Sequence, residues 1–282
     1  MKILLANLGV SERDGHFVKN MMLPTWKKNF DLVRRPDTEI TLRVSEWGVL
    51  GMEGLSCPAL DTLNTQLIFQ AAKNAEAEGF DAILITCFGD PMIDQLRAFV
   101  NIPVVGIGEA SFRMAAMMGK KFGVLHVNNK VVAECVKQIH EYGLGDYLAG
   151  IMATPESAEE QVEALVDAHE TIENFKICGR KLIEMGAEVL IPACGLMAPA
   201  LRVAPKCENI YPNGFTEVDG VPILDVLGVG IKYAEMMVDL KRAGSPWISR
   251  SGFYELPTPA QLESGHMCLE DDRIKFWDIS LT

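Results

Sequence analysis

The feature that most constrains the fold of this 282-residue chain is an internal repeat. The segment Gly79–Cys87 reads GFDAILITC, and Gly186–Cys194 reads GAEVLIPAC. In both copies an acidic residue follows the glycine after one intervening position, and a short apolar run then leads to the cysteine. The offset is constant, since 186 − 79 and 194 − 87 both give 107. A duplicated unit of this kind predicts two similar halves of the chain.

Each copy of the repeat has the character of a short strand buried in a parallel sheet. It follows a helical stretch that ends at glycine, and a further helix and strand come after it. The same order of elements holds upstream, which predicts four strands in each half. In chain order, the expected strands are residues 2–8, 39–44, 79–87 and 102–105 in the first half, and 121–127, 147–152, 186–194 and 221–224 in the second.

The predicted fold class is therefore α/β, with two pseudo-symmetric doubly wound parallel-sheet domains and the active site in the cleft between them. We assign residues 1–110 together with 226–282 to the first domain, which includes a return helix and a surface tail. Residues 111–225 form the second domain. The extra residues 206–219 are expected to form either a lid over the site or a surface excursion.

Composition narrows the classes of partner. The formal charge of −12 argues against nucleic acid, which requires clustered lysine and arginine. The first apolar run is too short for a signal peptide or a membrane span, so we expect a cytoplasmic protein with no membrane partner. The seven cysteines are odd in number and form no Cys-x-x-Cys pair, which indicates neither disulfides nor a metal site. A small-molecule substrate is the expected partner, and the sequence leaves open whether the chain forms a homo-oligomer.

The two repeat cysteines, Cys87 and Cys194, are the candidate catalytic residues. They end equivalent strands, where loops of parallel sheets form functional crevices. A helix N-terminus after each cysteine is expected to lower the pKa of the thiol towards neutrality. If the halves face each other, one thiol can remove a proton from one face of a carbon while the other returns a proton to the opposite face. A lone cysteine is more often a small buried apolar residue. That interpretation is kept for the other five: Cys57, Cys135, Cys178, Cys207 and Cys268.

Proton transfer on opposite faces is the chemistry of a racemase or epimerase, and it requires donors that stabilise an enolate. Backbone N–H groups after the cysteines are candidate donors. Polar residues after the first strand of each half could bind an anionic or amide group of the substrate. Their alternative role is to form turns or cap helices. Asp90 could cap the helix that follows Pro91 or could orient Cys87. The predicted substrate-binding residues are Asn7, Ser11, Phe88, Gly89, Asp90, His126, Asn128, Asn129, Gly195 and Leu196.

Three stretches resemble a known family. The sequence CFGDP at 87–91, the sequence IPVVGIGEA at 102–110 and the sequence CGLM at 194–197 are similar to the hydantoin racemase branch of the aspartate/glutamate racemase superfamily. The resemblance implies two pseudo-symmetric domains, no cofactor, and one catalytic thiol from each half. The expected substrate is an amino acid, a hydantoin or a related small acid. The segment Asn7-Leu8-Gly9-Val10 departs from the Asn-Pro-Asn-Ser/Thr that relatives commonly carry there.

Two alternatives remain open from the sequence. The superfamily that the chain resembles also contains maleate isomerases, which implies a cis–trans isomerase in which Cys87 attacks covalently and Cys194 acts as the acid. The other alternative is a ligand-binding protein that uses the cleft between its two lobes without turnover. A substrate adduct on Cys87 would distinguish the first alternative, and the absence of any proton exchange would favour the second.

Overall fold

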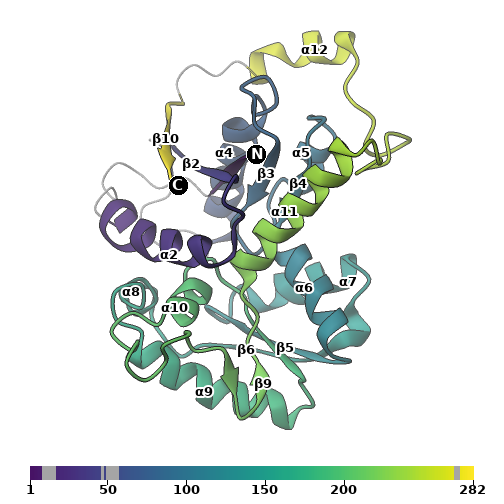
Figure 1. The fold of residues 1–282 in the computed structure, drawn as a ribbon. Helices are drawn as coiled ribbons and strands as arrows, with labels where there is room; N and C mark the ends of the chain where they lie inside the picture. Colours follow the sequence, from purple (N-terminus) through teal and green to yellow (C-terminus); the bar gives the residue numbers. More distant parts are fainter. Residues whose placement is uncertain (8–16, 46–47, 49–56, 270–273) are drawn as a thin grey trace.

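The computed structural model describes residues 1–7, 17–45, 48, 57–269 and 274–282. It shows two lobes, one above the other in Figure 1, each built around its own sheet. The fold is the predicted α/β class, and every pairing between strands 1 to 7 is parallel. The chain enters the first lobe, crosses to the second and then returns to the first through a long helix.

The first lobe contains a five-stranded sheet in the order β10-β2-β1-β3-β4. Its parallel strands are β1 (Lys2–Ala6), β2 (Glu39–Ser45), β3 (Ala82–Ile85) and β4 (Val104–Gly106), and β10 (Phe276–Ser280) lies antiparallel to β2. The helices of this part of the chain are the π-helix η2 (Val18–Met22), α2 (Leu23–Val33), α4 (Pro58–Ala72), α5 (Ile93–Arg97), α6 (Ile107–Met118), α11 (Val226–Arg242) and α12 (Pro259–Leu269).

The second lobe contains a three-stranded parallel sheet in the order β6-β5-β7. Its strands are β5 (Phe122–His126), β6 (Leu148–Ala153) and β7 (Val189–Pro192). Its remaining elements are α7 (Val132–Glu141), the 3-10 helix η3 (Gly145–Tyr147), α8 (Ala158–Glu163), α9 (His169–Glu184), α10 (Met197–Val203) and a small antiparallel pair, β8 (Glu217–Val218) and β9 (Val221–Pro222).

The repeat is a structural duplication. The bounds of β3 and β7 differ by the same 107 positions as the sequence copies, since 189 − 82 and 192 − 85 agree. All four residues of each strand are buried, which explains why both faces of the repeat are apolar. Each strand also pairs with the first strand of its own half, so the two cysteines that follow lie at equivalent sheet edges.

Two sequence predictions about the chain after β7 were wrong. The predicted fourth strand of the second half, residues 221–224, does not add a full strand to the parallel sheet. It pairs mainly with β8 and touches β7 through a single bridge between Leu190 and Ile223. The predicted tail after Ser245 is also not merely extended, because it forms α12 and then β10, which covers the outer edge of β2.

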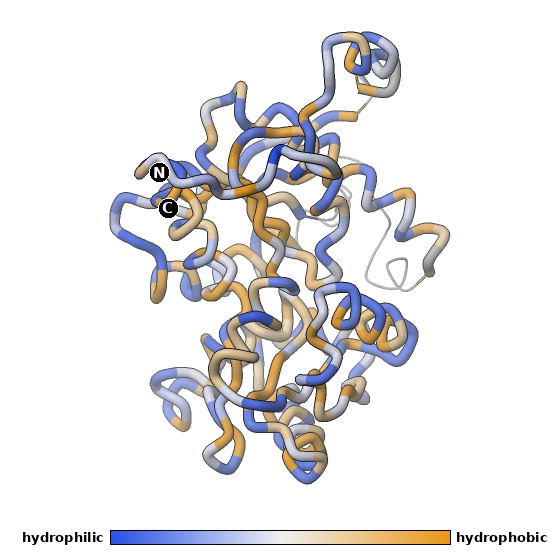
Figure 2. Tube along the Cα trace, turned by 90° about the vertical axis from the view of Figure 1, so that its right-hand side faces the viewer, coloured by the Kyte–Doolittle hydropathy of each residue, from blue (hydrophilic) through white to orange (hydrophobic). Residues whose placement is uncertain are grey.

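The apolar core is continuous between the lobes. Phe112 of α6 stacks on Phe122 of β5 with ring centroids 5.6 Å apart, so the helix that leaves the first sheet is anchored on the second. Hydrophobic stretches accordingly gather toward the middle of the molecule in Figure 2. Helix α11 packs against α6, α2 and β3. Its return is the basis for our proposed division into residues 1–110 plus 226–282 and residues 111–225.

Residues 206–219 pack on the second lobe. Cys207 is 1% exposed and Phe215 is 5% exposed, and the ring of Phe215 lies 6.3 Å from that of Phe175 on α9. No residue of 206–219 lines the large cavity described below. The structure therefore favours the surface excursion over the lid. No helix among the described residues is both long enough and apolar enough to cross a bilayer.

Candidate active site

A cavity of about 1120 Å³ lies between the two lobes, at the carboxyl ends of their parallel strands. Its wall contains Cys87, which follows β3, and Cys194, which follows β7. The thiols are near enough that the charge of Cys194 contributes to raising the pKa of Cys87. Equivalent positions of the two repeats therefore meet at one cavity, as the internal duplication predicts.

The Cys87 side of the cavity is partly open. Cys87 itself is partly exposed, and the ring of Phe88 meets Phe112 edge-on at 5.2 Å. The ring of His126, from the second lobe, lies 6.3 Å from the ring of Phe88. Nothing lies within 4 Å of where a Cβ on Gly89 would stand, so there is free space beside this loop.

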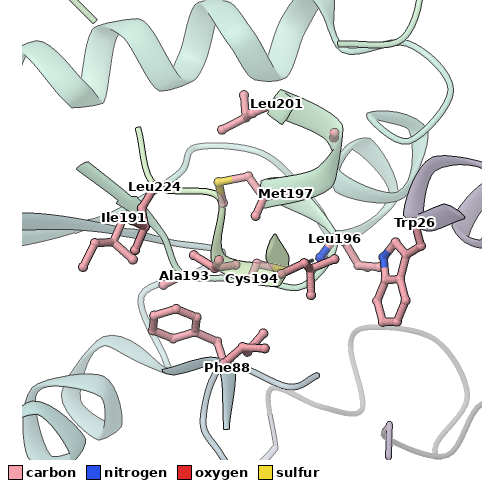
Figure 3. Packing of buried hydrophobic residues seen from close by; sticks show 14 of the residues in the cluster. Trp26, Phe88, Ile191, Ala193, Cys194, Leu196, Met197, Leu201 and Leu224 are labelled. Carbon is pink, nitrogen blue, oxygen red and sulfur yellow. Dashed lines mark hydrogen bonds between the residues drawn. The ribbon is translucent and has the colours of Figure 1, made fainter. Parts of the chain in front are cut away.

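The Cys194 side is more enclosed. Cys194 is 9% exposed, and its Sγ accepts a hydrogen bond from the backbone N–H of Leu196 at 3.3 Å. Figure 3 shows Cys194 at the turn into α10, with Phe88 of the first lobe opposite and Trp26 to one side. The indole Nε1 of Trp26 donates to the Gly195 carbonyl oxygen at 2.9 Å, which ties this turn to α2.

The two cysteine loops touch through a glycine. A Cβ built on Gly195 would stand 2.6 Å from the backbone oxygen of Thr86, the residue before Cys87. Real Cβ atoms do not approach a backbone oxygen that closely, so only glycine allows the loops to come together here. Gly195 therefore sets the separation of the lobes beside the two thiols.

Asp90 has a role that the sequence did not reveal. Its side chain neither caps the short helix after Pro91 nor bonds to Cys87, although its backbone N–H donates to the Cys87 carbonyl at 3.1 Å. Instead its Oδ1 accepts from the N–H of Gly108 at 2.9 Å and its Oδ2 accepts from the N–H of Glu109 at 2.6 Å. These two groups belong to the first turn of α6, so Asp90 caps a different helix from outside it.

Two side chains of the second lobe complete the surroundings of Asp90. The hydroxyl of Tyr142 donates to Asp90 Oδ2 at 2.8 Å, and Gln138 Nε2 donates to the same oxygen at 3.2 Å and to the Phe88 carbonyl at 2.9 Å. Asp90 also has a φ of 48°, in the left-handed region that is costly for a residue with a side chain. The carboxylate contacts hold the Cys87 loop in this strained conformation and tie it to α7.

The prediction of lowered thiol pKa values was wrong in direction. Burial raises the pKa of Cys87 to about 12, against a smaller lowering by the backbone N–H of Gly89. Burial also raises the pKa of Cys194, although the N–H groups of Met197 and Leu196 oppose it. Helix α5 begins only at Ile93 and is five residues long, so it offers the Cys87 thiol little of the expected dipole.

His126 is a neutral hydrogen-bond donor in the cavity. Burial lowers the pKa of its imidazole to about 4, so the ring carries no charge at neutral pH. Its Nδ1 accepts from the backbone N–H of Val127 at 2.8 Å, which places the ring proton on Nε2. His126 can therefore offer an N–H to a carbonyl oxygen without adding a positive charge to the site.

Most of the residues predicted to bind substrate are brought together by the fold. Asn128 lies on the wall, and its Oδ1 also accepts from the N–H of Lys130 at 2.9 Å, which is the turn role considered from sequence. Asn129 is exposed and lies off the wall, and Ser11 lies outside the described residues. The predicted residues that line the cavity are Asn7, Phe88, Gly89, Asp90, His126, Asn128, Gly195 and Leu196.

Sequence reasoning missed several wall residues, because nothing in their local pattern marks them. Trp26 is on a helix that reads as ordinary amphipathic surface, and Gln138 and Tyr142 are far from Asp90 in the chain. Two acidic residues were also missed: Asp61 on α4 and Glu156 after β6. The charge of Asp61 adds to the burial that raises the pKa of Cys87, and the charge of Glu156 does the same for Cys194.

Within the described part of the chain, no group of three His, Cys, Asp or Glu side chains is arranged to hold a metal ion. The independence from cofactors stays a prediction from the sequence.

Solved structures share the fold of this protein. An allantoin racemase from Klebsiella pneumoniae superposes with a TM-score of 0.71 at 21% identity, covering 91% of this chain and 94% of that one. An allantoin racemase from Pseudomonas fluorescens gives 0.67 at 22% identity, covering 92% and 98%. At these identities the likeness shows the fold alone, which is that of the two-domain racemases.

The sequence comparison then identifies the family. Residues 33–234 match the model described as Asp/Glu/Hydantoin racemase, and the chain belongs to this family of isomerases. A hydantoin racemase from Pseudomonas sp. strain NS671 is 28% identical over 217 residues, covering 75% of this chain and 78% of the relative. The resemblance noted in the three sequence motifs is thus confirmed.

Proposed function

We propose that this isomerase is a cofactor-independent racemase that inverts a carbon next to a carbonyl, with Cys87 and Cys194 as its two acid/base groups. The observation that carries the proposal is that equivalent strand-end thiols of the two lobes line one cavity. In the proposed reaction, one thiolate takes the proton from the carbon and the opposite thiol gives a proton to the other face. The thiol and thiolate exchange roles, so the reverse reaction uses the same groups.

The enolate that forms in such a reaction needs donors at the carbonyl oxygen. The Nε2–H of neutral His126 is one candidate, and the free space beside Gly89 leaves room for a substrate in the cavity. Donors fixed by the fold need no rearrangement during the reaction, which is how such groups lower the barrier. We therefore place the substrate between Phe88 and the Cys194 turn.

We further propose that the substrate is neutral, such as a 5-substituted hydantoin, in keeping with the names of the curated relatives. The carboxylate of a free amino acid is bound most strongly by a cation. Among the described wall residues, Arg97 and Arg113 both pair with Glu109 at 2.7 Å, and Lys137 pairs with Glu141 at 3.4 Å. A cyclic amide would instead use neutral donors and acceptors of the kind that His126 provides.

The test is proton exchange in D2O. A 5-benzylhydantoin of one hand is incubated with the protein, and loss of the C5 proton by NMR is followed together with loss of optical activity. We expect both rates to exceed those of a protein-free blank, since hydantoins also racemise slowly without enzyme. No excess exchange over the blank for hydantoins, amino acids or related small acids would contradict the proposal.

The cis–trans isomerase remains a second candidate, because Cys87 is more exposed than Cys194 and is therefore the more accessible nucleophile. In that reaction Cys87 adds to a carbon–carbon double bond, and Cys194 supplies the proton. Intact-protein mass spectrometry distinguishes the two. A maleate-mass adduct on Cys87 supports isomerisation, and unmodified protein under turnover with a hydantoin supports racemisation.

A further inference from the structure

Glu156 is a buried carboxylate that the proposed proton transfer does not use. It lies between β6 and α8, two residues after Thr154, whose N–H donates to the carbonyl of His126 at 2.8 Å. The next residue, Ser157, caps α8 through a reciprocal pair of hydrogen bonds with Glu160. Glu156 is thus held at a well-defined turn, and it is only 8% exposed.

Only one of the two carboxylate oxygens of Glu156 has a partner. Its Oε1 accepts from Asn174 Nδ2 at 3.2 Å, whereas its buried Oε2 has none. The nearby amide of Gln161 is already used, because its Nε2 donates to the Val127 carbonyl at 2.7 Å and to the Glu156 backbone carbonyl at 3.4 Å. A buried carboxylate oxygen without a donor is costly, so it is a natural place for a ligand to donate.

Glu156 lies on the wall of the active-site cavity, and because Oε2 is closed to solvent, a turn of the carboxylate is needed to bring this oxygen to a ligand. The residue is part of the cavity wall together with Cys194, His126 and Gln161. Its charge is close enough to Cys194 to raise the pKa of that thiol. A donor bound to Glu156 would therefore lie on the Cys194 side of the cavity.

We propose that Glu156 determines specificity by accepting a hydrogen bond from a ring N–H of the substrate through Oε2. The inference rests on the proposed function and narrows it to substrates that carry an N–H beside the reacting carbon, as cyclic ureides do. Substrates with an N-alkyl group or a ring oxygen at that position leave Oε2 without a partner. An ammonium group would also satisfy Glu156, but a free amino acid brings a carboxylate for which the described wall offers no unpaired cation.

The test measures binding and needs no turnover. The probe is 5,5-dimethylhydantoin, which has both ring N–H groups but no proton on C5. It is compared with its N1-methyl and N3-methyl derivatives by ligand-observed NMR titration. Wild-type protein, Glu156→Gln and Glu163→Gln are titrated in parallel. Glu163 lies on α8, is exposed and is off the cavity wall, so its substitution makes the same change of charge outside the site.

We expect wild type and Glu163→Gln to bind 5,5-dimethylhydantoin about 10- to 100-fold more tightly than its N1-methyl derivative, in which the N–H beside C5 is lost, because this is the usual effect of a hydrogen bond to a charged group. In Glu156→Gln an amide N–H2 replaces the accepting oxygen, and this ratio should fall to about 1. Equal melting temperatures of the three proteins show that the change is not caused by unfolding.

The inference is overturned if wild type binds all three hydantoins equally or not at all, or if Glu156→Gln keeps the wild-type ratio. Exchange at C5 of 5-benzylhydantoin in wild type is measured separately. If the C5 proton exchanges but the affinity ratio is the same in wild type and Glu156→Gln, Glu156 does not determine specificity and the racemase proposal is retained. An altered ratio without exchange supports the N–H contact and contradicts the racemase.

Discussion

The loop after Cys87 and the loop after Cys194 occupy equivalent places in a duplicated fold, yet they are held by different means. The Cys87 loop is strained at Asp90 and depends on contacts to α6 and α7. The Cys194 turn is packed against the other lobe through Gly195 and is bonded to Trp26. The Cys87 loop is therefore held by side-chain hydrogen bonds, and the Cys194 turn is held by close backbone packing.

The largest expected effect is on the catalytic thiol that each loop carries. Cys87→Ser and Cys194→Ser should each lower racemisation about 1000-fold or more, because a hydroxyl is a much weaker acid than a thiol. Each variant is assayed by optical rotation and by deuterium uptake from each hand of the substrate. Cys57→Ser, at an exposed position off the cavity wall, is the control. Wild-type racemisation by either single variant would rule out the two-thiol mechanism.

The next effect separates the closely packed Cys194 turn from the Cys87 loop, which has free space at Gly89. Gly195→Ala places a Cβ 2.6 Å from the Thr86 oxygen and must push the two cysteine loops apart. Since a shift of about 1 Å in reacting groups can cost about 100-fold, we expect a loss of that size in kcat. Gly89→Ala meets no protein atom within 4 Å, so it should leave the two loops in place and change kcat by about threefold or less, whereas its methyl group stands in the space proposed for the substrate and should raise KM. Equal losses in the two variants would show that the loops do not differ in this way.

A smaller effect, on the stability of the fold, tests the hydrogen bonds that Asp90 makes from the Cys87 loop. Asp90→Ala leaves the N–H groups of Gly108 and Glu109 and the hydroxyl of Tyr142 without their acceptor. We expect the free energy of unfolding to fall by about 2 kcal/mol, as measured by urea denaturation. Tyr142→Phe removes one donor and should cost about 1 kcal/mol. If Tyr142→Phe lowers the free energy of unfolding as much as Asp90→Ala does, the Tyr142 hydrogen bond alone stabilises the loop.

The last test is the pH dependence, which concerns both thiols. Burial raises the pKa of both thiols, so both are protonated at pH 7 and the thiolate fraction of the free enzyme increases about tenfold for each pH unit. The value of kcat/KM reports the free enzyme and should rise with a logarithmic slope near one from about pH 7 to 9. Rates are corrected with a blank at each pH. A plateau through this range would indicate a thiol pKa near or below neutrality.

Much of the fold could be read from the sequence because the repeat carries it. The Gly-to-Cys segments became β3 and β7 at the predicted spacing, and their apolar runs became fully buried strands. The tail was misjudged, although the alternation of Trp277-Asp278-Ile279-Ser280 has the period of an edge strand. What it pairs with is β2, more than 230 residues earlier, which no local pattern reveals.

The site was only partly predictable for the same reason. Strand ends identify Cys87, Cys194 and the residues next to them, since topology alone places those at the cleft. The contacts of Asp90 and the unpartnered oxygen of Glu156 depend on helices from other parts of the chain. The pKa of the thiols was misjudged because a local argument from helix termini omits burial, which is a property of the whole fold.

The pairing of β10 with β2 has a consequence for synthesis on the ribosome. The sheet of the second lobe needs only residues 122–192, whereas the sheet of the first lobe is not finished until residue 280 has emerged. During translation the outer edge of β2 therefore stays open while the later lobe is already able to form. Open strand edges are templates for aggregation, so shortening the chain before Phe276 should leave a protein that aggregates during expression.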